Sequence, residues 1–135
     1  MSYISRLGQI EISKSAFVRV IKINGKVYAD IRKEFTMDED LKRSGVCLTM
    51  EEFKSVVHYL QKKRELIDEE FESERRKITL RFFSFGVLLL LTKWNCKQMV
   101  DLSKEEILGL IASQTKVDSL IGVDEVDSTV KSNNN

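Results

Sequence analysis

Basic and aromatic side chains recur at two-residue spacing between residues 18 and 35, in the segment VRVIKINGKVYADIRKEF. Residues two apart on an extended strand share a side, so Lys26, Tyr28 and Arg32 would form one row with a repeat of about 6.6 Å. Cations bind the phosphates of a nucleic-acid strand, and aromatic rings among them can stack on any base. The row therefore suits sequence-tolerant nucleic-acid binding, although it also suits the solvated face of an ordinary sheet.

Other kinds of chemistry are not indicated. His58 is the only histidine, it falls on a predicted helix, and no recognisable nucleophile accompanies it. The two cysteines, Cys47 and Cys96, lack CxxC spacing, which argues against a zinc site and against a disulfide framework. We expect a protein that is not an enzyme and that has no metal site or other cofactor.

Charge is divided unevenly along the chain. Residues 1–64 carry 13 Lys and Arg against 8 Asp and Glu, a net charge of +5, whereas residues 65–135 carry 9 against 13, a net charge of −4. This division suggests a polyanionic partner for the first half, although +5 is also ordinary for a solvated surface.

Length and hydropathy limit the architecture. The 135 residues, 42% of them hydrophobic, suffice for one compact domain or for two very small modules that share a core. The longest apolar run, FFSFGVLLLL, is about half of the roughly 20 residues that a membrane-spanning helix needs. We expect a soluble intracellular protein without a membrane partner.

The elements that would position the basic row begin with a hairpin. An Asn-Gly pair at 24–25 between two alternating runs predicts a tight turn joining strands 17–23 and 26–35. Alternation places one set of side chains in a core and the cations on the opposite side. The predicted core set is Val18, Val20, Val27, Ala29 and Ile31.

The rest of the first half supplies further elements of an α+β fold. Residues 8–13 predict a preceding strand, 37–45 a charged loop and 46–48 a short fourth strand. Thr49 and Glu52 form a capping-box pattern, which predicts a helix from Thr49 to about Phe71. The fold class expected is thus a twisted antiparallel sheet of about four strands followed by a helix.

The same order of elements recurs after Lys77. The segment VCLTMEEFKSVV matches VDLSKEEILGLI, with Thr49 aligned to Ser103 and Glu52 to Glu106, and Gly86 would correspond to Gly25. We interpret this as a degenerate internal repeat. The expected domains are a first module (1–76), a second, degenerate copy packed on it (77–122) with a helix from 103 to about 121, and a disordered polar tail (123–135).

Taken in order, several pieces of the first half resemble the family of the transcriptional coactivator positive cofactor four. They are FVRV (17–20), NGKVYADIR (24–32), the aromatic Phe35, KRSG (42–45) and VCLTMEEF (46–53). The resemblance covers about residues 8–62. It implies a sheet that binds single-stranded DNA or unwound duplex across its open face, with RNA as an alternative ligand. It also implies a transcription coactivator or regulator in the nucleus that contacts the transcription machinery and dimerises through its helix.

The resemblance also implies roles for individual residues. Lys26 and Arg32 would contact phosphates, Phe35 would stack on a base, and Lys42 or Arg43 would represent a basic loop. Ile23 and Asn24 stand where the family is expected to have an aromatic and a lysine, and nearby cations would compensate. The full predicted nucleic-acid-binding set is Lys14, Arg19, Lys22, Lys26, Tyr28, Arg32, Phe35, Lys42 and Arg43.

Two alternatives remain open from the sequence. The two copies could form a pseudo-dimer within one chain, with the helix from Thr49 to about Phe71 packed against the helix from Ser103 to about Ile121. Alternatively, the first half could form a homodimer with the second half as an extension. The aromatic residues Phe82, Phe83, Phe85 and Trp94 are expected in a core or interface. The departures at Ile23 and Asn24 also leave open a protein-interaction or scaffold module that keeps the fold without the nucleic-acid channel.

Overall fold

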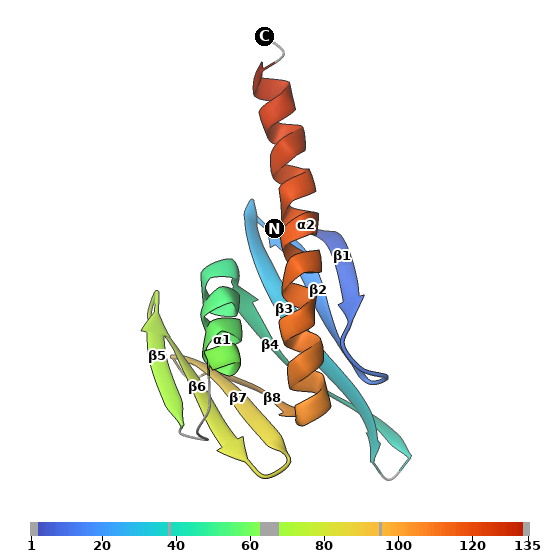
Figure 1. The fold of residues 1–135 in the computed structure, drawn as a ribbon, viewed down its shortest axis with the longest axis vertical. Helices are drawn as coiled ribbons and strands as arrows, with labels where there is room; N and C mark the ends of the chain where they lie inside the picture. The colour runs from blue at the N-terminus through green and yellow to red at the C-terminus, as the bar shows by residue number, and fades with distance from the viewer. Residues whose placement is uncertain (1–2, 38, 63–67, 95, 134–135) are drawn as a thin grey trace.

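The chain forms an α+β structure in which four strands precede each of two helices (Figure 1). The computed structural model describes residues 3–37, 39–62, 68–94 and 96–133. The first half contains β1 (Ile4–Glu11), β2 (Ala16–Ile23), β3 (Lys26–Met37), β4 (Asp40–Thr49) and α1 (Met50–Lys62). The second half contains β5 (Glu69–Ser73), β6 (Arg76–Phe83), β7 (Gly86–Lys93), β8 (Cys96–Ser103) and α2 (Lys104–Asn133).

All the strands belong to one antiparallel sheet of eight strands in the order β1-β2-β3-β4-β8-β7-β6-β5. The sheet is therefore twice as large as the sheet of about four strands that the sequence predicts. The last strand of each half lies at the centre, where β4 meets β8 through the pair Gly45 and Met99. Each half is a meander whose consecutive strands are neighbours, and its first strand lies at an outer edge.

Local signals explain the hairpins and the helix starts. Asn24 and Gly25 have φ angles of 50° and 86°, the positive values that a tight hairpin turn requires. The N-terminus of α1 is capped as predicted: the backbone N–H of Glu52 donates to Thr49 Oγ1 at 3.2 Å, and the N–H of Thr49 donates to Glu52 Oε1 at 2.8 Å. Ser103 and Glu106 make the matching pair of bonds at α2, at 3.1 and 3.0 Å.

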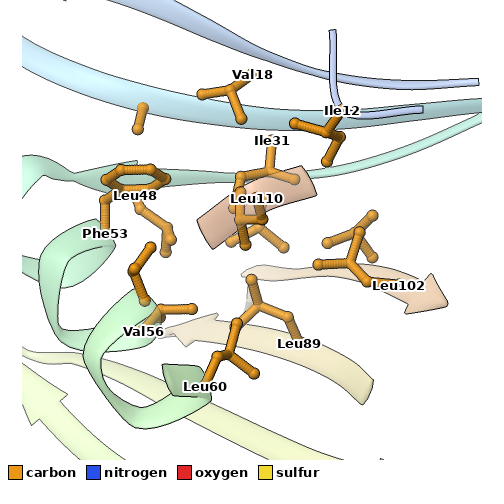
Figure 2. Packing of buried hydrophobic residues seen from close by; sticks show 14 of the residues in the cluster. Ile12, Val18, Ile31, Leu48, Phe53, Val56, Leu60, Leu89, Leu102 and Leu110 are labelled. Atoms are coloured by element: carbon orange, nitrogen blue, oxygen red, sulfur yellow. The ribbon is translucent and has the colours of Figure 1, made fainter. Parts of the chain in front are cut away.

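The core lies between the strands of the two halves and the two helices. Figure 2 shows Val18 and Ile31 of the first half on one side and Leu89 and Leu102 of the second half on the other, with Phe53 of α1 between them. All five side chains are fully buried. Each half thus buries its apolar side against the other. The predicted core positions of the first hairpin are confirmed for Val18, Val20, Ala29 and Ile31.

Ion pairs cross the junction between the halves, and two of them involve a buried glutamate. Arg76 of β6 lies 3.0 Å from Glu52 of α1, measured from Nε to Oε2, and it also donates to the carbonyl of Cys47 in β4. Lys33 of β3 lies 2.8 Å from Glu106 of α2, measured from Nζ to Oε1. The same Nζ donates to the carbonyl of Asp101 in β8 at 3.1 Å.

These cross-half ion pairs are reciprocal, because each cation comes from one half and both of its acceptors from the other. Glu52 and Glu106 are almost fully buried, so each needs a compensating charge. Burial acts to raise the pKa of Glu106, but hydrogen bonds from Lys33 and from the Ser103 backbone outweigh it and lower the pKa. Burial acts to lower the pKa of Lys33, but the hydrogen bond to Glu106 and the negative charges of Glu106 and Asp101 together raise it.

The segment at 37–45 differs from the charged loop that the sequence predicts. β3 runs to Met37 and β4 begins at Asp40, so the two strands form one long hairpin. Residue 38 lies outside the described part of the chain. Charged residues are compatible with strands here because an antiparallel hairpin can keep one side in water.

The prediction that the first helix continues to about Phe71 is wrong. Helix α1 ends at Lys62, residues 63–67 lie outside the described part, and β5 pairs with β6 from Glu69 onward. The ring of Phe71 packs on Tyr59 of α1, with centroids 5.4 Å apart. Pairing with β6 therefore overrides the helical tendency of this glutamate-rich segment.

Helix α2 is longer than predicted. It continues to Asn133 through most of the segment for which the sequence predicts a disordered tail, and Figure 1 shows its C-terminal part projecting beyond the strands. Across the described residues, neither helix combines the length and apolar character needed to span a membrane.

Candidate nucleic-acid interface

The candidate interface lies on the side of β2, β3 and β4 that faces away from the helices. Val18 and Val20 of β2 point into the core, so the alternate residues Phe17, Arg19 and Ile21 lie on the outer side. In register with them, β3 places Arg32, Asp30 and Tyr28 opposite these three residues. We call this side the outer face.

A buried carboxylate binds two guanidinium groups at the centre of the outer face. Arg19 Nη2 donates to Asp30 Oδ2 at 2.6 Å, and Arg32 Nε donates to Asp30 Oδ1 at 2.8 Å. Asp30 is 1% exposed, whereas the side chains of Arg19 and Arg32 are 30% and 36% exposed. Asp30 therefore holds both guanidinium groups in place, while the two arginine side chains stay partly exposed to solvent. We call these three residues the arginine cluster.

The neighbouring strand is shaped to accept Arg32. Gly45 of β4 pairs with Arg32, and a Cβ added at Gly45 would lie 2.5 Å from Arg32 Cδ and 2.8 Å from the Ile31 carbonyl oxygen. Any larger residue would need the arginine or the backbone to move. The lack of a side chain at Gly45 thus lets the aliphatic part of Arg32 lie across β4.

A shallow hollow of about 230 Å³ adjoins the cluster. Arg43 of β4 borders it and is 70% exposed, with Nε 3.6 Å from Glu34 Oε1. This separation is long for an ion pair, and an exposed pair of this kind contributes little to stability. The residues that line the hollow are Phe17, Arg19, Arg32, Lys33, Glu34 and Arg43.

Lys26 is on the outer face but is already paired. Its Nζ lies 2.9 Å from Glu74 Oε2 in the turn between β5 and β6, and 5.9 Å from the centroid of the Tyr28 ring. The hydrogen bond from Lys26 lowers the pKa of Glu74, and the same bond raises the pKa of Lys26. A nucleic-acid phosphate would compete with Glu74 for this lysine.

The remaining predicted residues are not brought into the cluster. Lys14 is exposed in the loop between β1 and β2, where it borders a hollow shared with Glu105 and Glu106 at the start of α2. Lys22 lies two residues from Val20 on β2, so its side chain is on the same, helix-facing side of the strand. Phe35 and Lys42 pair through their backbones, and their side chains lie outside the described part of the structure.

The thiol of Cys47, on the outer face, is not activated as a nucleophile. Burial, with a further contribution from the charge of Asp30, raises the pKa of the Cys47 thiol to about 11, so it stays protonated near neutral pH. Within the described residues, no group of three or more His, Cys, Asp and Glu could hold a metal ion. What this arrangement can do chemically is bind anions and planar rings.

Sequence reasoning missed three parts of the site: the burial of Asp30, the role of Gly45 and the position of Phe17. One signal was available. Counting outward from the two-residue turn pairs Arg19 with Asp30 and Phe17 with Arg32, which is the register observed. The contact of Arg32 with Gly45 depends on the longer pairing of β3 with β4, which the predicted charged loop concealed.

The second half has exposed aromatic residues instead of a charged cluster. The rings of Phe83 and Phe85 stack with centroids 5.2 Å apart and an angle of 5° between their planes. Both are exposed, as is Trp94, which is 77% exposed. A core position is therefore wrong for these three residues, and an interface position stays a prediction for them. Phe82 packs partly against the core.

Comparison with known proteins assigns the chain to no family. No protein-family model matches the chain, and no curated protein matches it either.

Proposed function

We propose that the protein binds single-stranded nucleic acid, either DNA or RNA, across the outer face of β2, β3 and β4, without catalysis. The observation that carries this proposal is the arginine cluster, in which buried Asp30 holds Arg19 and Arg32 in fixed positions on an accessible surface. Fixed guanidinium groups suit phosphates because less side-chain freedom is lost when they bind.

The geometry leaves donors available for a ligand. Every hydrogen bond that Arg32 donates to a described residue starts from Nε, so its two Nη groups could hold a phosphate. Arg43 adds an exposed cation next to the cluster, and its ion-pair contact with Glu34, at 3.6 Å, is long. Together these groups favour a polyanion that lies along the face and makes several contacts at once.

The resemblance to the coactivator family supports the same reading and extends it. It implies a role in transcription or in another transaction of unwound DNA, with a nuclear location and contact with the transcription machinery. These extensions rest on the resemblance alone, whereas the binding proposal also rests on the arginine cluster.

We also propose that the two halves are degenerate copies that form a pseudo-dimer within one chain. The alignment of VCL with VDL makes Gly45 equivalent to Met99, and these two residues pair with each other at the centre of the sheet. A residue that pairs with its own equivalent is expected on a two-fold axis. The acceptors of the two cross-half ion pairs are also equivalent, Glu52 with Glu106 and the Cys47 carbonyl with the Asp101 carbonyl, whereas the cations come from different strands of the two meanders, β6 and β3.

The rival arrangement is a homodimer of the first half. Light scattering on the full chain separates the two, because the pseudo-dimer predicts the mass of one chain and the homodimer twice that mass. A dimeric mass that persists on dilution would contradict the pseudo-dimer.

A fluorescence anisotropy titration tests binding, using a labelled thymine oligonucleotide of about 20 nucleotides at two salt concentrations. We expect Arg32→Ala to weaken binding about tenfold and to reduce the salt dependence by about one ion. The matched control is Arg81→Ala, which removes the same charge from an exposed position in β6. The Arg81 variant should bind within about twofold of wild type.

A scaffold function is the second candidate, and one observation favours it. Arg19 and Arg32 share Asp30, Lys26 contacts Glu74 and Arg43 contacts Glu34, so carboxylates offset much of the local positive charge. If wild type fails to bind at low salt, or if both substitutions weaken binding equally, the binding proposal is wrong and the scaffold function replaces it.

A further inference from the structure

Phe17 occupies a place beside the arginine cluster that suits it for contact with a flat ligand. It is the cross-strand partner of Arg32, it is only partly buried, and it lines the hollow described above. Gly45 lets Arg32 lie over β4, on the opposite side of Arg32 from Phe17. The phenyl ring and the two arginines therefore border the hollow from different sides.

The size and charge of the hollow limit what it can hold. Its volume of about 230 Å³ is below the roughly 300–1,000 Å³ of pockets that enclose a whole small molecule. One ring that belongs to a longer, largely exposed polymer fits this description better. Arg19, Arg32 and Arg43 bring three positive charges to the hollow, opposed by Glu34 and by Asp30 beneath the arginines, which leaves an excess of one positive charge for a phosphate. The fourth cation, Lys33, is already paired with Glu106.

We propose that this hollow is a subsite for one unpaired nucleotide, with the base against the ring of Phe17 and the adjoining phosphate between Arg32 and Arg43. The inference rests on the proposed nucleic-acid binding and names the residue that contacts the base. It assigns base stacking to Phe17 rather than to Phe35, for which the resemblance implies that role. Because every base has a stackable face, such a subsite tolerates any sequence.

The test separates base contacts from phosphate contacts by using two ligands of equal length. One is a thymine oligonucleotide and the other has the same sugar-phosphate backbone with abasic sites. Wild type should bind the thymine strand about fivefold to tenfold more tightly, the effect expected from loss of one stacked base. Phe17→Leu should bring this ratio close to one while leaving affinity for the abasic strand unchanged.

Three further variants act as controls. Phe17→Tyr keeps an aromatic ring and should keep the ratio, which shows that any loss in Phe17→Leu comes from the ring and not from misfolding. Phe83→Leu removes an exposed aromatic from the second half and should also keep the ratio. Phe35→Leu tests the role implied by the resemblance, and this substitution should leave the ratio unchanged.

Photocrosslinking locates the contact directly. A strand carrying 5-iodouracil, irradiated in complex with the full chain and analysed by mass spectrometry, should yield a crosslink at Phe17. A crosslink at Phe35 or Phe83 instead, or an unchanged ratio in Phe17→Leu, would overturn the assignment. Equal binding of both strands by wild type would refute base stacking but leave phosphate binding intact. Absence of binding to either strand would refute the proposed function itself.

Discussion

The outer faces of the two halves differ at matching positions. Counted outward from the two-residue turns at 24–25 and 84–85, the positions of Arg19, Asp30 and Arg32 match those of Thr79, Leu90 and Thr92. In both halves the middle position is buried, at 1% exposed for Asp30 and 6% for Leu90. One half fills it with a carboxylate that fixes two cations, and the other fills it with a hydrocarbon.

This contrast shows that the framework and the surface are determined by different residues. The helix-facing sides of both halves contribute buried apolar residues to one core, and both helices start with the same capping pattern. The outer faces, in contrast, differ in chemistry. Because a shared fold does not imply a shared function, a binding function of the first half must be argued from its own side chains. Substitutions in each half test that contrast, beginning with the one expected to change stability most.

The first experiment compares the two positions that directly follow the turns, Gly86 and Lys26. A Cβ at Gly86 would lie 1.9 Å from the carbonyl oxygen of Leu102, and the φ of 154° is unfavourable for other residues. Gly86→Ala should therefore lower the free energy of unfolding by about 3–4 kcal/mol in urea denaturation. Lys26→Ala, at the exposed counterpart, should change it by less than about 0.5 kcal/mol. Equal effects would show that the two hairpins are not packed differently.

The second experiment converts the first half toward the second. Asp30→Leu leaves Arg19 and Arg32 without their shared carboxylate, so we expect a loss of about 2–3 kcal/mol in unfolding free energy and at least tenfold weaker oligonucleotide binding. Adding Arg19→Thr and Arg32→Thr gives these three positions the residue types of Thr79, Leu90 and Thr92 in the second half. The triple variant should recover most of the stability, because no unpaired charge remains, but should not recover binding. Recovery of binding would contradict the role of the arginine cluster.

The third experiment concerns pH and the ion pair between Lys33 and Glu106. The pKa of Glu106 is lowered in the folded protein, so its contribution to stability is present above its ordinary pKa of 4.5 and is lost as pH falls through the lower folded value. Glu106→Gln should cost about 1–2 kcal/mol near pH 7, and the difference from wild type should shrink in acid. Urea denaturation at several pH values measures this. Glu105→Gln, at the exposed neighbouring position, should show no such pH-dependent difference.

The pKa of Lys33 sets the upper pH limit for the contribution of the Lys33–Glu106 ion pair to stability. Because this pKa is raised above 10.5 in the folded state, the lysine contributes fully below 10.5 and its contribution is lost as pH rises through the higher folded value. Stability of wild type relative to Glu106→Gln should therefore be greatest between these limits. A difference that is constant from acid to alkaline pH would contradict an ion-pair origin.

The smallest effect is expected at the exposed pair of Lys26 and Glu74. Glu74→Gln should leave the unfolding free energy unchanged within the error of urea denaturation, since both side chains are about half exposed and solvent screens the pair. It should raise affinity for a single strand about twofold, because Lys26 no longer has a carboxylate partner there. Glu72→Gln changes net charge equally and should have no effect on affinity. Equal increases in both variants would point to net charge rather than to Lys26.

Local patterns in the sequence were sufficient for much of the framework. The turn at Asn24-Gly25, the capping boxes at Thr49 and Ser103 and the alternation of apolar residues in β2 each depend on a few neighbouring residues, and each was predicted correctly. Strand β5 was missed because a glutamate-rich segment becomes a strand only through pairing with β6. The continuous sheet was missed because it depends on one contact between distant strands, Gly45 with Met99.

The candidate site was predictable only in part for the same physical reason. Alternation was enough to place Arg19, Tyr28 and Arg32 on one side of the hairpin. The burial of Asp30 depends on how both arginines fold over it, and the pairing of Lys26 with Glu74 joins two halves that are far apart in sequence. Such contacts have no signature in a single stretch of residues.

The cross-half ion pairs also have a consequence for synthesis of the chain on the ribosome. When translation has just completed α1, the carboxylate of Glu52 and the carbonyl of Cys47 still lack their partner, Arg76. Lys33 must wait longer, because its partner Glu106 lies 73 residues further along. Contacts of such long range form late in folding. The nascent first half therefore emerges with incomplete charge compensation, and its native arrangement is completed only after the N-terminus of α2 has left the exit tunnel.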